Sequence, residues 1–132
     1  FSQQAIAELR VLYAAVSEIV TLTEDAFVNG NMENAYRVEP LEQVVDGLKE
    51  NIRRRHILRL QKSECTIEHG FVLSDILTNM ERVSDHCSNI AVAIIEAASD
   101  RYDSHQYLDS IKTGENKAFQ QAYKQYSEKY AF

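Results

Sequence analysis

Apolar residues recur at alternating intervals of three and four along most of this chain, and this spacing is typical of one face of an α-helix. The first apolar row covers three heptads and comprises Ile6, Leu9, Tyr13, Val16, Val20, Thr23 and Phe27. A β fold needs many turns, whereas this chain of 132 residues contains 4 Gly and 1 Pro. The sequence therefore predicts an all-α fold.

Two short polar segments divide the apolar pattern into three long helices. Gly30 can end the first helix in the left-handed conformation, and Asn31 can then cap the second. We expect the second helix over residues 31–62, with a kink or a short break at Pro40, and the third over residues 67–99. The second helix carries an apolar row of Val38, Leu41, Val45, Leu48 and Ile52; the third carries Ile76, Met80, Val83, Cys87, Ile90, Ile94 and Ala97. Three such helices joined by short turns must pack up and down to bury these rows.

The composition changes after the third helix. Residues 100–114 are polar and turn-prone, and they are followed by an aromatic row at helical spacing that comprises Phe119, Tyr123, Tyr126 and Tyr130. The row is typical of a helix that packs on the bundle, although a partner surface is an alternative. We therefore expect a helical bundle over residues 1–99, and over residues 100–132 a linker and a C-terminal docking helix of the same domain.

The charge and the cysteine content exclude several classes of protein. A net charge of -6 disfavours nucleic acid as a partner, because the phosphate backbone would repel the average surface. Two cysteines form no disulfide framework and suit the reducing cytosol. No segment approaches the ~20 apolar residues of a membrane helix, so we expect this piece to be soluble. The start at Phe1 suggests that it was cut from a longer protein.

Paired acids form the most unusual polar pattern. Glu42 with Asp46, and Glu81 with Asp85, stand four residues apart, so each pair stacks on one helical face. Each like-charge pair should cost about 0.2–0.5 kcal/mol unless a cation compensates. Glu39 and Asn89 extend the two rows by about one turn.

Hairpin geometry places the two acidic rows at one height. If the second turn is centred near Cys65, facing residues have numbers that sum to about 130, so Asp46 lies level with Asp85. Carboxylates at one height suit iron, manganese, magnesium or calcium. Counting ~100° per residue from the apolar row nevertheless puts Glu81 and Asp85 near the back of the third helix. The residues alone leave open a metal site on the outer surface and a solvated acidic face.

Residues 80–91, Met-Glu-Arg-Val-Ser-Asp-His-Cys-Ser-Asn-Ile-Ala, resemble the signature of the PhoU family. The Glu42 to Asp46 pair, followed by Leu48 and Ile52, resembles the other ExxxD helix of that family, and the resemblance covers residues 1–99. Residues 54–66 resemble the branch fused to the carboxyl end of bacterial sodium/phosphate cotransporters. Ser84 departs from the pattern, because it replaces the usual glycine.

The resemblance implies a three-helix PhoU-like bundle on the cytoplasmic side of the membrane, with a regulatory role in phosphate uptake. It implies that ExxxD acids bind iron, zinc, manganese or another divalent cation, with Glu42, Asp46, Glu81, Asp85 and Asn89 as ligands and Glu39 as a weaker candidate. The implied partners are the upstream transporter part of the same protein, phosphate-signalling proteins and a second copy of the chain. Free-standing regulators have two PhoU units and this chain has one, which leaves open whether a complete multinuclear cluster forms.

A basic group lies at the end of the second helix and comprises Arg53, Arg54, Arg55, Arg59 and Lys62. It is either a solvated helix end or a docking patch for the anionic inner leaflet or the acidic loops of a transporter.

Two hypotheses for the function follow from these patterns. No paired nucleophile and base, glycine-rich phosphate loop or histidine-based zinc motif is present, so we expect no enzyme. The first hypothesis is a regulatory domain of a sodium-dependent phosphate transporter that acts through metal binding, partner contact or both. The second is a metal-free helical adaptor that docks through the basic helix end and the aromatic tail.

Overall fold

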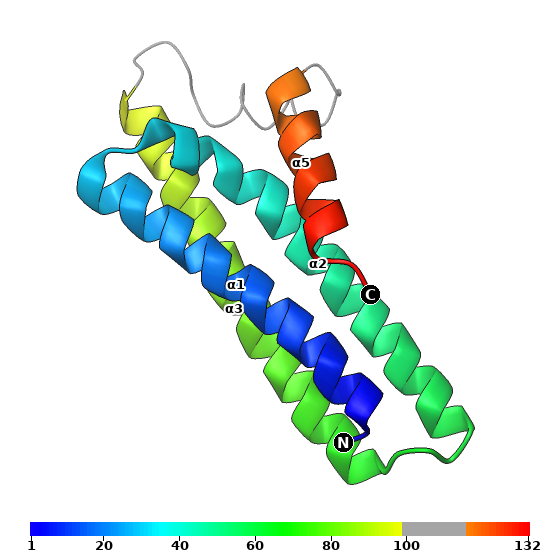
Figure 1. Cartoon of the computed structure of the whole chain (residues 1–132). Coiled ribbons are helices and arrows are strands. Elements are labelled where there is room, and N and C mark those ends of the chain that lie inside the picture. Colours follow the sequence, from blue (N-terminus) through cyan, green and yellow to red (C-terminus); the bar gives the residue numbers. More distant parts are fainter. Residues whose placement is uncertain (99–115) are drawn as a thin grey trace.

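The computed structural model describes residues 1–98 and 116–132, and within them every element is a helix. The helices are α1 (Gln3–Asn29), α2 (Met32–Gln61), α3 (Ile67–Ala98) and α5 (Lys117–Lys129). The first three run up and down along one another, and α5 packs against α2 (Figure 1). The all-α three-helix bundle with an additional C-terminal helix is thus confirmed. The expected linker over residues 100–114 lies outside the described residues, and the division at residue 99 stays a prediction.

The turn between α1 and α2 forms as its residues predict. Gly30 has φ 67°, in the left-handed region, and ends α1. Asn31 caps α2 by accepting a hydrogen bond from the backbone N–H of Asn34. The carboxylate of Asp25 accepts hydrogen bonds from the side chains of Asn29, Asn31 and Asn34, and so ties the end of α1 to the start of α2.

A kink or a short break was expected at Pro40; the break is absent, because α2 is continuous from Met32 to Gln61, and the kink stays a prediction. Proline removes one backbone donor, and one lost hydrogen bond does not end a helix whose flanking turns are held by tertiary packing. Those turns are packed here: Val38 and Leu41 are fully buried on either side of Pro40.

The expected apolar row of α2 is confirmed, whereas the expected rows of α1 and α3 are only half right. In α1 the exposed members are Ile6, Tyr13, Val20 and Phe27, and in α3 they are Val83, Ile90 and Ala97. The buried faces are instead centred on Leu12 and Ile19 in α1 and on Leu77 and Ala91 in α3. Small residues such as Ala15 and Ser84 pack at the helix contacts and add little hydrophobicity to the sequence pattern, so the pattern placed both buried faces one position away.

A buried acid from α1 meets two arginines from α2. Glu8 is only 1% exposed and Arg59 only 6%. The Arg59 guanidinium lies 3.4 Å from Glu8 Oε1, and Arg55 Nη1 donates to Glu8 Oε2 at 3.1 Å. Arg55 also stacks on the ring of Phe132 and donates to the backbone oxygen of that residue. This cluster joins α1, α2 and the end of the chain.

The aromatic row of α5 packs on the bundle, as predicted. Phe119 is buried beside Ala26 and Ile95, and Tyr130 is buried in the main core. The hydroxyl of Tyr130 donates to Glu18 of α1, and Lys129 Nζ lies 2.8 Å from the same carboxylate. Tyr123 is the member of the row that is exposed.

Within the described residues, no helix combines the length and the apolar character that a bilayer crossing requires.

Glu8→Ala should strongly destabilise the fold, because it leaves the buried Arg59 without a counter-charge. We expect a loss of about 3–5 kcal/mol in the free energy of unfolding, measured by denaturant titration. Arg54→Ala, which removes a charge from an exposed position of the same helix, should change stability by less than about 0.5 kcal/mol. Equal losses in the two variants would contradict a structural role for the Glu8 cluster.

The docking of α5 should weaken in acid. Burial raises the pKa of the Glu18 carboxyl, but hydrogen bonds from Lys129 and Tyr130 outweigh burial, so its pKa lies below the ordinary value of 4.5. The stabilisation is therefore complete above about pH 4.5 and disappears as the pH falls through the folded-state pKa. Wild type should be about 1 kcal/mol more stable than Glu18→Gln at neutral pH, and this difference should vanish in acid. A difference that is independent of pH would refute the assignment.

Candidate functional site

The acidic rows of α2 and α3 lie along one side of the contact between these helices, and we call this row of carboxylates, with Lys49, the groove. Glu39, Glu42 and Asp46 follow one another along α2 at spacings of three and four, so they share one side of the helix. Two contacts cross to α3: Ser88 donates a hydrogen bond to Glu39, and Lys49 Nζ lies 2.8 Å from Glu81 Oε1. In both pairs the residue numbers sum to about 130, as the hairpin geometry predicts.

Glu81 and Asp85 do not lie at the back of α3, where the count from the apolar row put them: the carboxylate of Glu81 meets Lys49 of α2, and the charge of Asp85 acts on Glu39 and Glu42. The error follows from the buried face of α3, which is centred near Leu77 and Ala91 and not on the row through Val83 and Ile90. At ~100° per residue, this correction brings Glu81 and Asp85 to roughly a quarter turn from the buried face, on the side of α2.

Lys49 lies between the two rows of acids. It is only 7% exposed, and its ammonium lies 3.0 Å from Asp46 Oδ1, 2.8 Å from Glu81 Oε1 and 3.6 Å from Glu50 Oε1. Burial lowers the pKa of Lys49, but hydrogen bonds to Glu81 and Asp46 outweigh it and leave the pKa above the ordinary 10.5. Lys49 is therefore a permanent positive charge that links α2 to α3.

Glu42 and Glu39 experience the remaining negative charge of the groove. Burial, together with the charges of Glu39, Asp46, Asp85 and Glu81, raises the pKa of Glu42 to about 7. Burial and the charge of Asp85 also raise the pKa of Glu39, although the hydrogen bond from Ser88 opposes them. Lys49 pairs with Asp46 and Glu81, so the carboxylates of Glu39 and Glu42 are left without a full counter-charge.

The donor set of the groove fits a hard or borderline cation, because it consists of carboxylate oxygens from two facing helices. Its present spacing fits an ammonium better than a metal ion: among the described residues, no three His, Cys, Asp or Glu side chains surround a common point. Asp46 and Asp85 are exposed, and Asn89 is exposed one turn beyond Asp85. A metal ion would need these side chains to converge and Lys49 to withdraw.

The structure divides the basic group at the end of α2. Arg55 and Arg59 turn toward Glu8 and hold the core together. Arg53 pairs with Glu50 at 3.0 Å, and Arg54 and Lys62 are exposed. The outward part of the group is thus Arg53, Arg54 and Lys62.

Sequence reasoning missed Lys49 and Glu8, two of the charged residues that the bundle buries with partners. Lys49 stands three residues after Asp46 and next to Leu48, so it lies at the edge of the apolar row of α2. That position was the available signal, since a cation beside two acids compensates their repulsion. Glu8 gave no comparable signal, because its arginine partners lie about fifty residues away.

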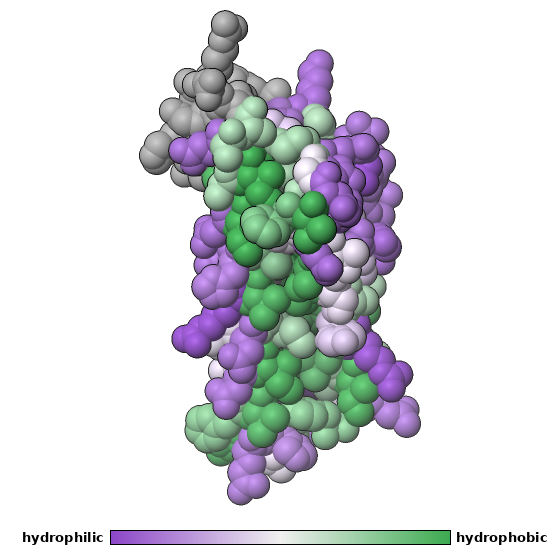
Figure 2. Space-filling model, turned by 90° about the vertical axis from the view of Figure 1, so that its left-hand side faces the viewer, coloured by the Kyte–Doolittle hydropathy of each residue, from purple (hydrophilic) through white to green (hydrophobic). Residues whose placement is uncertain are grey.

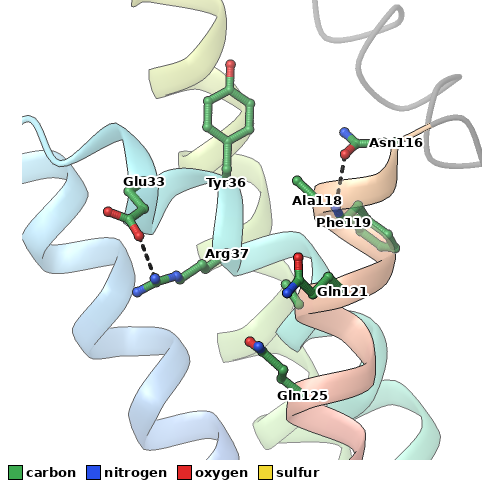
Figure 3. Close-up of a pocket in the computed structure, with 9 residues that line it drawn as sticks. Glu33, Tyr36, Arg37, Asn116, Ala118, Phe119, Gln121 and Gln125 are labelled. Atoms are coloured by element: carbon green, nitrogen blue, oxygen red, sulfur yellow. Dashed lines mark hydrogen bonds and ion pairs between the residues drawn. The ribbon is translucent and has the colours of Figure 1, made fainter.

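A separate pocket of about 560 Å³ lies between the start of α2 and α5 (Figure 3). Its charged side chains, Glu33 and Arg37, form an ion pair at 2.6 Å. The remaining lining residues are uncharged: Tyr36, Asn116, Ala118, Phe119, Gln121, Ala122 and Gln125. The described residues that line the pocket therefore carry no net charge that would attract an anion such as phosphate.

Comparison with known proteins identifies the family. The family model described as the PhoU domain matches residues 9–94. The phosphate-specific transport system accessory protein PhoU homolog 1 of Thermotoga maritima is 24% identical over 111 residues, which are 84% of this chain and 47% of that protein. The phosphate-specific transport system accessory protein PhoU homolog of Zymomonas mobilis is 32% identical over 91 residues, which are 69% of this chain and 38% of that protein.

The chain thus spans less than half the length of these two relatives. No solved structure matches it. The matched region extends from the first half of α1 to the last turns of α3 and includes both acidic rows of the groove. The chain belongs to the PhoU domain family.

Proposed function

We propose that this chain is a non-catalytic regulatory domain of phosphate transport that contacts a protein partner and binds a divalent cation between α2 and α3. The names of the two relatives, accessory proteins of phosphate-specific transport systems, support the role in phosphate transport. The carboxylate groove supports the cation.

The protein context that we propose is a sodium-dependent phosphate cotransporter with this domain at its carboxyl end, on the cytoplasmic face of the membrane. The resemblance of residues 54–66 to that branch supports it. In this setting the partners are the membrane part of the same protein and phosphate-signalling proteins.

The observation that carries the cation proposal is the raised pKa of Glu42, to about 7, in a groove that already contains Lys49. One ammonium does not balance the carboxylates around it, so a divalent ion would be attracted. Iron, zinc or manganese would be held by oxygens from a set that comprises Glu39, Glu42, Asp46, Glu81, Asp85 and Asn89. When bound, the ion supplies two positive charges that hold α2 against α3.

Lys49 competes with such an ion, because its ammonium occupies the oxygens of Asp46 and Glu81. The domain would then alternate between a form in which Lys49 links α2 to α3 and a form in which the metal ion links these helices. Displacement of Lys49 would change the charge and the shape of the surface around Asp46 and Glu81. A partner protein could therefore bind the two forms with different affinities.

A second candidate function is the metal-free adaptor. It is favoured by the completeness of the Lys49 bridge and by an exposed surface on α2 where Arg53 and Arg54 flank Ile57 and Leu58. The two functions differ in whether chelators affect partner binding.

Replacing Asp46 and Asp85 together by Asn should abolish metal uptake, because it removes two negative ligand groups from the groove. Wild type, dialysed against manganese, zinc or ferrous iron, should retain about one ion or more per chain by elemental analysis, and the variant should retain none. The matched control is Glu68→Gln with Asp75→Asn, which removes two exposed acids from α3 outside the groove. Wild type that retains no metal would favour the adaptor, and equal uptake by the two variants would place the metal elsewhere.

Lys49→Met should tighten metal binding, because it removes the competing cation and preserves the length of the side chain. We expect the dissociation constant for manganese to fall about tenfold, measured by isothermal titration, while the metal-free variant becomes less stable than wild type. Lys124→Met on α5 is the control, since it removes an exposed ammonium far from the groove in sequence. The same dissociation constant in both variants would show that Lys49 does not compete.

A further inference from the structure

Cys65 is held against His56 by the turn that joins α2 to α3 (Figure 1). The turn closes the end of α2 with a backbone hydrogen bond from the N–H of Glu64 to the oxygen of Arg59, at 2.8 Å. Ser63 has φ 57°, so the backbone there adopts the left-handed conformation that reverses a chain after a helix. The reversal brings Cys65 back over the last turns of α2, where His56 lies.

The sulfur of Cys65 contacts two polar atoms of His56. Sγ lies 3.7 Å from Nδ1 of the imidazole, and the thiol donates to the backbone oxygen of His56 at 3.9 Å. Cys65 is a free cysteine and is partly exposed, whereas Cys87 is buried in the main core. Cys65 is therefore the cysteine that a reagent in solution can reach.

His56 is buried, and one of its ring nitrogens is unpaired. The residue is 8% exposed, and among the described residues its Nε2 has no hydrogen-bond partner. That nitrogen faces Gly70 of α3 so closely that a Cβ at residue 70 would lie 2.8 Å from it. Burial and the charge of Arg59 lower the pKa of His56, so the ring is neutral at pH 7 and carries one N–H hydrogen. A hydrogen on Nε2 would be a buried donor without an acceptor, and such donors are rare, so the hydrogen is assigned to Nδ1.

The Nδ1–H group of His56 thus points at the sulfur of Cys65. The thiolate is the nucleophile in thiol chemistry, and an ionised acceptor makes a stronger hydrogen bond than a neutral one. The same N–H therefore donates to the sulfur before and after the thiol loses its proton. Cys65 also stands two residues before α3 begins at Ile67, beside the positive end of a helix of 32 residues. Both features suit a sulfur that carries negative charge when it reacts.

We propose that Cys65 is a site of reversible thiol modification, where it forms a mixed disulfide with a low-molecular-weight disulfide such as glutathione disulfide. The thiol loses its proton to water, and the thiolate attacks one sulfur of the disulfide. A bond forms between Sγ and that sulfur while the disulfide bond of the reagent breaks. The other half leaves as a thiolate and takes up a proton from water. Cys65 is oxidised and the leaving half is reduced, so the exchange needs no further oxidant. His56 is the positioning residue in this step.

The described residues around the turn suit a polar reagent. The sequence neighbours of Cys65 are polar and exposed: Lys62, Ser63, Glu64 and Thr66. On the face shown in Figure 2, hydrophobic and hydrophilic side chains are interspersed over the lower end of the molecule, which is the end that carries the turn. A polar disulfide can therefore approach this end from water.

The experiment is incubation of the 132-residue chain with glutathione disulfide at pH 7, followed by mass spectrometry of the intact chain and of its peptides. We expect one glutathione adduct, on Cys65, which dithiothreitol removes. It should form at least ~10-fold faster than in a peptide of residues 60–68, which contains Cys65 but lacks His56 and a folded α3. A rate no higher than that of the peptide, or an adduct on Cys87 instead, would overturn the proposal.

Two substitutions test the part that His56 plays. Asparagine carries an amide N–H close to the position of Nδ1 but cannot act as a base, whereas leucine offers no donor. His56→Leu should therefore lower the rate of adduct formation about tenfold, and His56→Asn should keep it within about threefold of wild type. Circular dichroism would verify that both variants remain helical. A rate in His56→Leu that equals the rate of wild type or of His56→Asn would exclude the donor role.

His86→Leu is the matched control, because it removes an exposed histidine of α3 that is far from the turn in sequence. Its rate should equal that of wild type, and a rate as low as that of His56→Leu would contradict the assignment to His56. Failure of the metal experiment would leave these results unchanged, since neither Cys65 nor His56 belongs to the groove.

Discussion

The antiparallel packing of α2 against α3 sets the height and the side at which every polar group of the groove meets its neighbours. Like-charged residues from two helices come together there, and such an arrangement is stable only where positive charge or proton uptake relieves the repulsion. The protein uses both means. Lys49 bridges Asp46 and Glu81, and burial, together with the charges of the neighbouring acids, raises the pKa of Glu42 to about 7.

Buried charges elsewhere in the bundle define how the helices fit together. Glu8 lies among apolar neighbours of α1, and its arginine partners on α2 fix the rotation and height of these two helices, because an unpaired buried carboxylate would be costly. The end of the chain joins the same cluster through Phe132. Arg59, which a count of basic residues assigns to the surface, is therefore buried in the core, and the partly exposed Arg55 joins it at the edge.

Among the described residues, the apolar patterns of α1 and α3 are broader than the faces that the bundle buries, and this excess explains the errors in the predicted buried faces. A wide apolar face predicts that a segment is helical, but it does not predict which side of the helix is buried. The predicted buried faces of α1 and α3 were therefore displaced. The displacement then put Glu81 and Asp85 on the wrong side of α3.

The sequence by itself determined the all-α fold, the positions of three long helices, the turn at Gly30 and Asn31, the buried row of α2 and the common height of the acidic rows. These features depend on helical periodicity and on local capping, which are properties of neighbouring residues. Only the tertiary structure decided which flank of α1 and α3 is buried, that Lys49 lies between the acids, and that Arg55 and Arg59 neutralise Glu8. These depend on contacts between residues about thirty to fifty positions apart, and on small side chains whose close packing outweighs their low hydrophobicity.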